Sequence, residues 1–534
     1  MHTSITSGPA LARSRPSASF LRRPLHVLAV VALAAVLGGC EWENWAKTEK
    51  VQPEYLAQPD SAKQLVDYIK RAGAERKRVR MTGSGHSASD IAITNDVMLT
   101  PEKLNRTLTL DRARLKNTTE PRLVRVQSGI RIADLNNHLG RNGMALFNMG
   151  GYDGQTIAGV MMTATHGSGL AYGPIADQVV SLQMVVEGGR MVQIEPTNGI
   201  TSPAKFNGKL EEDSKIPVQL IQNDDAFNAA RVSIGSMGVV YSVTLRADQK
   251  FWLREVRYKT KWSELKKPGG PIERLIQGLP VYADRPSPAH WELQYTPYAD
   301  ANGDHTFLVT ERHRSYSPLP EQAAAERGQP GTDFVSGLIT VIEKPLAWIV
   351  DTFPSLAKTI LEQSLTSQED DNYTNVSYRV FNIGVVNYTD AIAVEAAFDI
   401  QQTVAAIERS FAVADAQFAL GNVHSSPVAI RFVKQTDALI ATQYGRNTMF
   451  MEVIGLRDSR GIRALLGAHQ RTYLQEFGAR PHWGLDLNLL TSEAQLRALY
   501  PRWDVWKAQF RTFNANGTFD GKVTDRLGIS VRPR

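Results

Sequence analysis

Two short glycine-rich segments, each with one histidine, constrain the fold of this chain more than any other part of its sequence. The first segment is Thr82-Gly83-Ser84-Gly85-His86-Ser87, and residues 78–81 before it have the pattern of a short strand. The second segment is Thr165-His166-Gly167-Ser168-Gly169. Glycine has no Cβ, so these turns can bring backbone N–H groups close to an anion such as a pyrophosphate. Together the segments predict two walls of a cofactor site.

The histidine of the first turn, His86, is the unusual residue. A neutral imidazole is a nucleophile near pH 7 and can attack an electrophilic carbon held beside it. Ser84 and Ser87 add hydroxyl donors to the same turn. Taken alone the motif is weak, because glycine-rich turns are common and a surface turn can carry an incidental histidine.

The residues around these turns resemble the vanillyl-alcohol-oxidase superfamily of flavoproteins, and within it the sugar-lactone and alditol oxidases. The resemblance covers residues 80–111, a second flavin segment over residues 148–169 and a third over residues 233–240. Residues 428–432 and 477–484 are similar to substrate-domain segments of D-arabinono-1,4-lactone and L-gulonolactone oxidases. Several ordered matches are far more specific than one motif.

This resemblance implies an α+β protein with two main parts. Residues 60–248 are expected to form a two-subdomain FAD-binding domain of the p-cresol-methylhydroxylase (PCMH) type. Residues 249–490 are expected to form an α+β substrate (cap) domain with an antiparallel sheet, and residues 491–534 to return to the flavin domain. The sequence pattern agrees, since short strands, turns and amphipathic helices alternate up to Asp248 and longer strands follow.

The resemblance also implies which residues hold the cofactor. FAD is expected to be covalently linked through His86, which would keep it in place outside the cell and make it more oxidising. The expected cofactor-binding residues are Gly83, Ser84, Gly85, His86, Ser87, Gly150, Thr156, Gly159, Thr163, Thr165, His166, Gly167, Ser168, Gly238 and Val239.

Two residues of the substrate half are the expected catalytic residues. Oxidation of an alcohol needs hydride transfer to the flavin and a group that takes or stabilises the hydroxyl proton. Arg431 carries a permanent charge that can stabilise a developing alkoxide or a reduced, anionic flavin; the alternative is a structural ion pair. His482 is expected on the opposite side, as a base or as a hydrogen-bond partner of the substrate oxygen. No group of residues has the spacing of a metal site.

Two positions depart from the pattern of relatives that oxidise sugar lactones or polyols. Those relatives commonly carry glutamate two residues before the arginine and lysine two residues after the His-Trp pair, whereas this chain has Ala429 and Leu485. A pocket that lacks these charges holds several hydroxyl groups less well. Either Glu452, Asp486 and Asn488 substitute for them, or the substrate is less polar than a sugar lactone.

Three functions are therefore open. The leading hypothesis is an oxidase of a secondary alcohol, such as D-arabinono-1,4-lactone, that passes electrons to O2 and gives H2O2, or instead to a membrane electron acceptor. The second is a flavin oxidase or dehydrogenase of an apolar, sterol-like alcohol, because residues 334–365 are unusually apolar and fit core helices, a lid or a membrane-facing surface. The third is an anchored binding protein without turnover.

The N-terminus predicts export. Residues 1–39 combine four arginines and no acidic residue with an apolar run over residues 25–37 that is shorter than a typical membrane span. The only cysteine, Cys40, follows Leu-Gly-Gly, which resembles the bacterial lipobox, where the thiol is acylated; an incidental cysteine is the alternative. Arg22 and Arg23 favour export of the folded protein. We expect a lipid-anchored protein of the bacterial cell envelope, outside the cytoplasm, with residues 40–59 as a linker.

The charge of the chain excludes a nucleic-acid partner. The formal net charge falls from +6 to +2 once the four arginines of residues 1–39 are set aside. So small an excess of positive charge gives no electrostatic footprint for nucleic acid. The expected partners are a small alcohol or lactone, an electron acceptor and a membrane.

Overall fold

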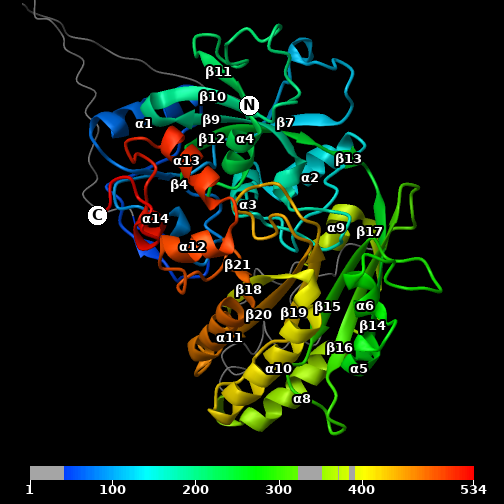
Figure 1. The fold of residues 1–534 in the computed structure, drawn as a ribbon. Coiled ribbons are helices and arrows are strands. Elements are labelled where there is room, and N and C mark those ends of the chain that lie inside the picture. Colours follow the sequence, from blue (N-terminus) through cyan, green and yellow to red (C-terminus); the bar gives the residue numbers. More distant parts are fainter. Residues whose placement is uncertain (1–40, 323–350, 371, 384–390) are drawn as a thin grey trace, which may run out of the picture. The chain divides into compact units, whose positions relative to one another are not determined.

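The computed structural model describes residues 41–322, 351–370, 372–383 and 391–534. The predicted export signal and Cys40 lie outside the described residues, and so do residues 334–350 of the predicted apolar stretch. Within the described ranges, helices and strands are mixed in both halves of the molecule, which confirms the predicted α+β class (Figure 1). The helices in these ranges are all too short or too polar to cross a membrane.

The first flavin subdomain is built on a small parallel sheet. Helix α1 (Ala62–Ala74) begins at Ser61, whose side chain accepts a hydrogen bond from the backbone N–H of Gln64. Its apolar residues at helical spacing are buried against the sheet and the neighbouring subdomain. The sheet holds, in spatial order, β3 (Tyr55–Ala57), β5 (Val97–Leu99) and β4 (Val79–Met81). The glycine turn follows β4 directly, so it starts from a fixed strand as predicted.

A six-stranded sheet forms the second flavin subdomain. Its apolar face packs against α2 (Ile132–Arg141), α3 (Ile157–Met162) and α4 (Asp224–Arg231). Two of its strands, over residues 179–186 and 190–195, form a hairpin with Gly188 and Gly189 at φ of 74° and 70° in the turn. In spatial order the strands are β11 (Val218–Gln222), β10 (Arg190–Glu195), β9 (Val179–Val186), β12 (Val239–Arg246), β7 (Leu123–Gln127) and β6 (Thr107–Leu108).

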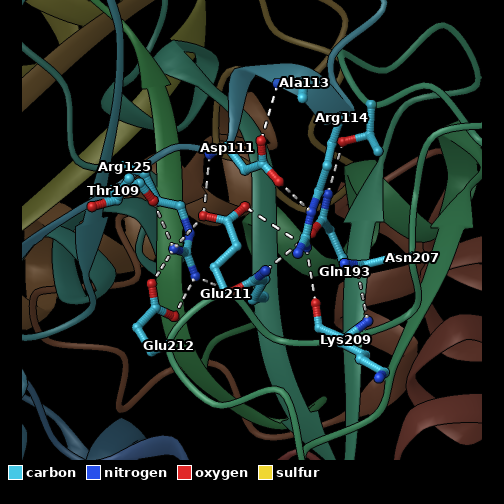
Figure 2. A network of polar contacts seen from close by, with 12 residues as sticks. Thr109, Asp111, Ala113, Arg114, Arg125, Gln193, Asn207, Lys209, Glu211 and Glu212 are labelled. Atoms are coloured by element: carbon cyan, nitrogen blue, oxygen red, sulfur yellow. Dashed lines mark hydrogen bonds and ion pairs between the residues drawn. The ribbon is translucent and has the colours of Figure 1, made fainter.

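Part of the opposite face of this sheet is polar and closed. Arg125 lies between Glu211 and Glu212, with Arg114 and Asp111 beyond them (Figure 2). The Arg125 guanidinium lies 3.1 Å from Glu211 Oε2 and donates to Gln183 Oε1 at 2.6 Å. Polar groups that leave water need such partners. This network, which we call the closed polar face, joins the sheet to the loop before β11.

The substrate half contains an antiparallel eight-stranded sheet, as predicted. Side chains alternate between its faces, and the apolar face packs against α5 (Trp262–Lys266), α6 (Pro271–Ile276), α10 (Thr403–Ala419) and α11 (Ile462–Phe477). The strands, in spatial order, are β17 (Tyr373–Val376), β14 (Trp252–Lys261), β16 (Thr306–Ser315), β15 (His290–Tyr295), β19 (Val428–Val433), β20 (Thr448–Leu456), β18 (Ala391–Asp399) and β21 (Arg480–Pro481).

Four further elements, two short strands and two helices, lie outside the three main sheets. A two-stranded sheet of β8 (Met144–Ala145) and β13 (Asp248–Gln249) lies at the predicted end of the flavin domain. Helix α9 (Ser377–Phe381) follows β17. Helix α8 (Pro354–Thr366) is the described end of the apolar stretch, and its buried residues pack in a small core cluster with α10.

Both ends of the described chain lie against the flavin domain. Strands β1 (Trp42–Glu43) and β2 (Lys50–Val51) form a hairpin in the segment expected to be a linker. At the other end, α12 (Glu493–Leu499), α13 (Trp503–Phe513) and α14 (Lys522–Arg526) lie beside α4 and β4 (Figure 1). The backbone N–H of Val79 in β4 donates to the Thr518 carbonyl at 2.7 Å. The C-terminal segment therefore holds the strand that leads into the glycine turn.

Candidate active site

A cavity of about 460 Å³ lies between the flavin domain and the substrate sheet. Its walls come from the glycine turn, from the segment around α3 and from the face of the eight-stranded sheet opposite the helices. The structure brings most of the predicted site residues to this cavity, although they are far apart in the sequence. Those that line it are Gly83, Ser84, Gly85, His86, Ser87, Gly150, Thr156, Gly159, Thr163, Thr165, His166, Arg431 and His482.

Four predicted cofactor residues, Gly167, Ser168, Gly238 and Val239, do not line the cavity. The buried hydroxyl of Ser168 donates to the carbonyl of Trp291, which ties the flavin domain to the substrate sheet. A Cβ at Gly167 would lie 2.2 Å from an Asn148 side-chain oxygen, and one at Gly238 would lie 2.9 Å from the Val185 carbonyl. Close packing therefore requires glycine at both positions. In the sequence, a glycine required by packing cannot be distinguished from one required by contact with a cofactor.

The third flavin segment reaches the cavity through residues that the sequence did not single out. Ile234 and Gly235 line the cavity and have φ of 49° and 68°. A β-branched residue with positive φ is a genuine outlier, and such strain gathers at functional sites. The Arg80 guanidinium holds the bend, donating to the carbonyls of Ile234 at 2.6 Å and Gly235 at 2.8 Å. Arg80, in the strand before the glycine turn, is the sequence feature from which a contact with this bend could have been suspected.

The glycine turn has the properties of an anion site. Gly85 has a φ of 71°, and a Cβ at Gly83 would lie 2.7 Å from Thr156 Oγ1, so the turn needs glycine at both positions. Within the described part of the chain, the backbone N–H groups of residues 83–87 donate no hydrogen bond to protein atoms. Free N–H groups in a tight turn suit a phosphate group. The residues present therefore fit a dinucleotide cofactor such as FAD.

His86 lies between two aromatic rings. The ring centroids of Trp45 and Tyr152 are each 4.7 Å from the imidazole centroid. The backbone N–H of Trp45 donates to the Gly85 carbonyl at 2.8 Å, so the N-terminal hairpin is fixed on the glycine turn. Burial lowers the pKa of His86 to about 4, because the charged imidazolium loses its hydration. The side chain is therefore neutral at pH 7, as a nucleophile has to be.

Arg431 lies on the opposite wall, between two carboxylates. Its Nη1 atom donates to Glu452 Oε2 at 2.9 Å and lies 3.6 Å from Glu395 Oε1. Burial acts against the charge of the guanidinium, but Glu452, Glu292 and Glu395 outweigh it and raise the pKa of Arg431 above its ordinary value. The arginine thus carries a fixed positive charge in a largely buried site.

The two carboxylates differ in their surroundings. Burial alone would raise the pKa of Glu395, but His166, His482 and Arg431 hold it at about 2. Burial raises the pKa of Glu452, and the charge of Glu395 adds to this effect while Arg431 opposes it. Opposite shifts in neighbouring carboxylates are typical of acid and base pairs in active sites.

Two of the three cavity histidines, His166 and His482, lie around Glu395. His166 Nδ1 donates to the Gly167 carbonyl at 2.9 Å, and its Nε2 lies 3.6 Å from Glu395 Oε2. His482 accepts a hydrogen bond from the backbone N–H of Gly484 through Nδ1 at 3.1 Å, and burial lowers its pKa to about 4. His166, Glu395 and His482 also form a set of side chains that could hold a metal ion. No metal-ligand spacing in the sequence predicted this group.

Of the three residues suggested as substitutes for the missing charges, only Glu452 lines the cavity. Asp486 accepts hydrogen bonds from Asn488, and neither lines the cavity. Sequence reasoning missed Glu395 entirely. Glu395 could have been noticed as the single charged residue in the apolar segment 391–398. An unpaired carboxylate in such a segment destabilises the folded state, so a glutamate there indicates a specific partner or function.

Comparison with known proteins agrees with this site. Residues 53–195 match the FAD binding domain family, and residues 291–527 match the D-arabinono-1,4-lactone oxidase family. The chain is 27% identical to the L-gulono-1,4-lactone dehydrogenase of Mycobacterium tuberculosis, over 91% of this chain and 98% of that protein. It is 25% identical to the L-gulonolactone oxidase of Mus musculus, over 83% of this chain and 89% of that protein.

The solved structures agree on the fold. A crystal structure of cholesterol oxidase from B. sterolicum superposes with a TM-score of 0.70 at 15% identity and covers 91% of this chain and 96% of that chain. At this identity the likeness concerns the fold alone. The chain is an FAD-dependent oxidoreductase in which a match to the FAD binding domain family is followed by a match to the D-arabinono-1,4-lactone oxidase family.

Proposed function

We propose that the protein oxidises a secondary alcohol of the sugar-lactone type, such as D-arabinono-1,4-lactone or L-gulono-1,4-lactone, with FAD linked covalently to His86. The observation that carries this proposal is the position of Arg431 between Glu395 and Glu452 in a cavity whose other wall is the glycine turn. The names of the relatives support the substrate class.

The wall formed by the substrate sheet favours a substrate with several hydroxyl groups. Besides its charged residues, this part of the cavity is lined by apolar residues that include Ile392, Ile454, Leu456 and Leu485, and by the polar residues Gln294, Ser364, Gln368, Ser425 and Ser426. The polar side chains both donate and accept hydrogen bonds. Gln368 donates to Ser364 and Ser426 donates to Pro427, but these side chains keep further donors and acceptors that an apolar alcohol would leave unused. A lactone with free hydroxyl groups satisfies them.

The chain's own residues supply binding, orientation and charge. Bound FAD would supply the two-electron acceptor, and His86 would be its attachment point. Arg431 stabilises negative charge on the substrate oxygen as the hydroxyl proton leaves, because its guanidinium is permanently charged and already fixed by two carboxylates. Trp45 and Tyr152 cover His86 and keep it neutral.

An anaerobic substrate panel tests this function. Lactones, alditols and sterols are each mixed with the purified protein, and bleaching of the flavin absorbance is recorded. Sugar lactones are expected to bleach the flavin and sterols are not. Bleaching by sterols alone would favour the apolar alcohol, and bleaching by no alcohol would favour a binding protein. Readmitting air then tests O2 as the acceptor, because an oxidase releases H2O2.

Acid precipitation tests the covalent link separately. The pellet of the wild-type protein is expected to remain yellow, and that of the His86→Ala variant to be colourless. A colourless wild-type pellet would show that the cofactor is bound without a covalent bond.

We also propose that Cys40 is acylated and holds the protein on a membrane of the cell envelope. The support is the lipobox-like sequence before Cys40. Mass spectrometry of the N-terminal peptide is expected to find an acylated cysteine, and the Cys40→Ala variant to move from the membrane to the soluble fraction.

A further inference from the structure

The cavity holds a second carboxylate beside Arg431 that is placed to react with substrate. Glu452 of β20 lies directly opposite Ala429 of β19 and Glu395 of β18, so the three side chains share the cavity face of the sheet. The Glu452 side chain is 17% exposed and that of Glu395 is 6% exposed. Of the two carboxylates, Glu452 is therefore the more accessible from the cavity.

The partners of the two carboxylates give them different tasks. Glu395 faces His166, His482 and Arg431, whereas among the described residues Glu452 Oε2 accepts a hydrogen bond from Arg431 and Oε1 accepts none. Its other oxygen, Oε1, remains for the substrate. A carboxylate surrounded by three partners stays ionised, and a neighbouring one that shares a single cation binds a proton more readily.

We propose that Glu452 accepts the hydroxyl proton of the substrate, while Glu395 stays ionised and positions His166 and His482. This inference rests on the proposed function and names the base of the same reaction. The substrate O–H bond breaks, and its proton passes to Glu452 Oε1. The electron pair of the neighbouring C–H bond leaves as hydride to the flavin, and the C–O bond becomes a carbonyl. The substrate thus loses two electrons, which bound FAD would accept, and Glu452 later returns its proton to water.

The pH dependence follows from the groups around Glu452. These are Arg431 from β19, Glu395 from β18 and His166 from the flavin domain, with His482 beyond Glu395. Glu452 accepts a proton only when it is ionised, so the rate of flavin reduction falls as the pH drops through its raised pKa.

The test compares Glu452→Gln with a matched control, Glu292→Gln. Glu292 lies opposite Arg431 on the other neighbouring strand, is bound to Arg312 at 2.7 Å and does not line the cavity. The rate of anaerobic flavin reduction by a lactone is measured across pH. In E452Q the rate of flavin reduction is expected to be lower by about 100-fold or more, and it should no longer decrease at low pH. In E292Q the rate should still decrease at low pH. A wild-type rate and pH profile in E452Q would overturn the proposal.

Relocating the carboxylate separates a catalytic role from a structural one. Ala429 lies opposite Glu452 on the same face, so the double variant Ala429→Glu with Glu452→Ala moves the carboxylate by one strand. It is expected to regain part of the rate and the fall at low pH that Glu452→Ala loses. If the folded double variant stays at the level of E452A, the carboxylate is not the reactive group and the proposal fails.

An infrared titration needs no turnover. The difference between the infrared titrations of the wild type and E452Q is expected to contain a protonated carboxyl band that titrates above the ordinary range of glutamate, and this band is expected to persist in Glu395→Gln. A difference spectrum without such a band would overturn the assignment. If no alcohol bleaches the wild-type flavin, the proposed function fails, and this titration still decides which carboxylate holds the proton.

Discussion

Each half of the protein contains a sheet with a charged face, and the two faces differ in what completes them. On the closed polar face, Arg125 is bound by Glu211, Glu212 and Gln183 of the same domain (Figure 2). On the substrate sheet, Arg431 also has two carboxylate neighbours, but this face opens into the cavity. The same kind of cluster stabilises the fold where the chain covers it and is available for chemistry where a cavity faces it.

The largest effect is expected from breaking the closed polar face. Arg125→Met leaves Glu212 without its cation and leaves Glu211 with Arg114 alone at 3.9 Å, so the free energy of unfolding is expected to fall by about 3–5 kcal/mol. Denaturant unfolding measures this change. The control is Arg246→Met. The Arg246 side chain is 53% exposed and forms an ion pair with Glu120, and an exposed pair of this kind contributes only about 0–1 kcal/mol to the free energy of unfolding. Flavin reduction per folded molecule should be unchanged in both variants.

The matching change on the open face should act on chemistry. Arg431→Met removes the charge that stabilises the substrate oxygen, and flavin reduction is expected to slow by about 100- to 1000-fold. Unfolding should be affected less than in R125M, because Glu452 can bind a proton and water can enter the cavity. Stopped-flow absorbance and denaturant unfolding give both values. If Arg431→Met strongly lowers the free energy of unfolding but leaves flavin reduction normal, the two charged faces do not differ in function.

Glu395 should make the stability of the open face depend on pH. Its folded pKa of about 2 lies below the value of about 4.3 expected when unfolded, so its contribution is present above that value and lost as the pH falls toward 2. Between these values the loss is about 1.4 kcal/mol per pH unit. The unfolding curves of wild type and Glu395→Gln should converge over this range. Parallel curves would mean that Glu395 is not held ionised.

The smallest effect concerns the flavin side of the cavity. Trp45→Ala removes a ring that covers His86, so the pKa of His86 should rise from about 4 toward its ordinary value near 6.5. NMR titration of the imidazole in flavin-free protein measures the shift. Trp42→Ala changes the same hairpin and is the control. An unchanged pKa in W45A would assign the burial of His86 to Tyr152 and the turn itself.

Several features could be predicted from local sequence. The glycine turn, the strand before it and the hairpin around Gly188 follow from short patterns, because glycine is needed where φ is positive or another chain comes close. The residue alternation over 428–433 is typical of a strand that has Arg431 on its less buried face, and the structure has this strand. The packing role of Gly238 could not be separated from cofactor contact, since both require a missing Cβ.

Other features depend on residues that are far apart in the sequence. No local pattern pairs Glu452 with Ala429, because that contact comes from the register of β19 on β20. The same holds for Trp45 on His86 and for Arg80 on the bend at Ile234, which packing brings together.

The sequence by itself determined that this chain is a flavin-dependent oxidoreductase with His86 in a glycine turn and Arg431 on a strand of the substrate half. Such signals are local, since they depend on backbone conformation and side-chain alternation. Only the tertiary structure decided which carboxylates contact Arg431 and which side chains are buried. Strand register and burial fix those distances, and electrostatic interactions at short range in a buried site then set which carboxylate keeps its charge.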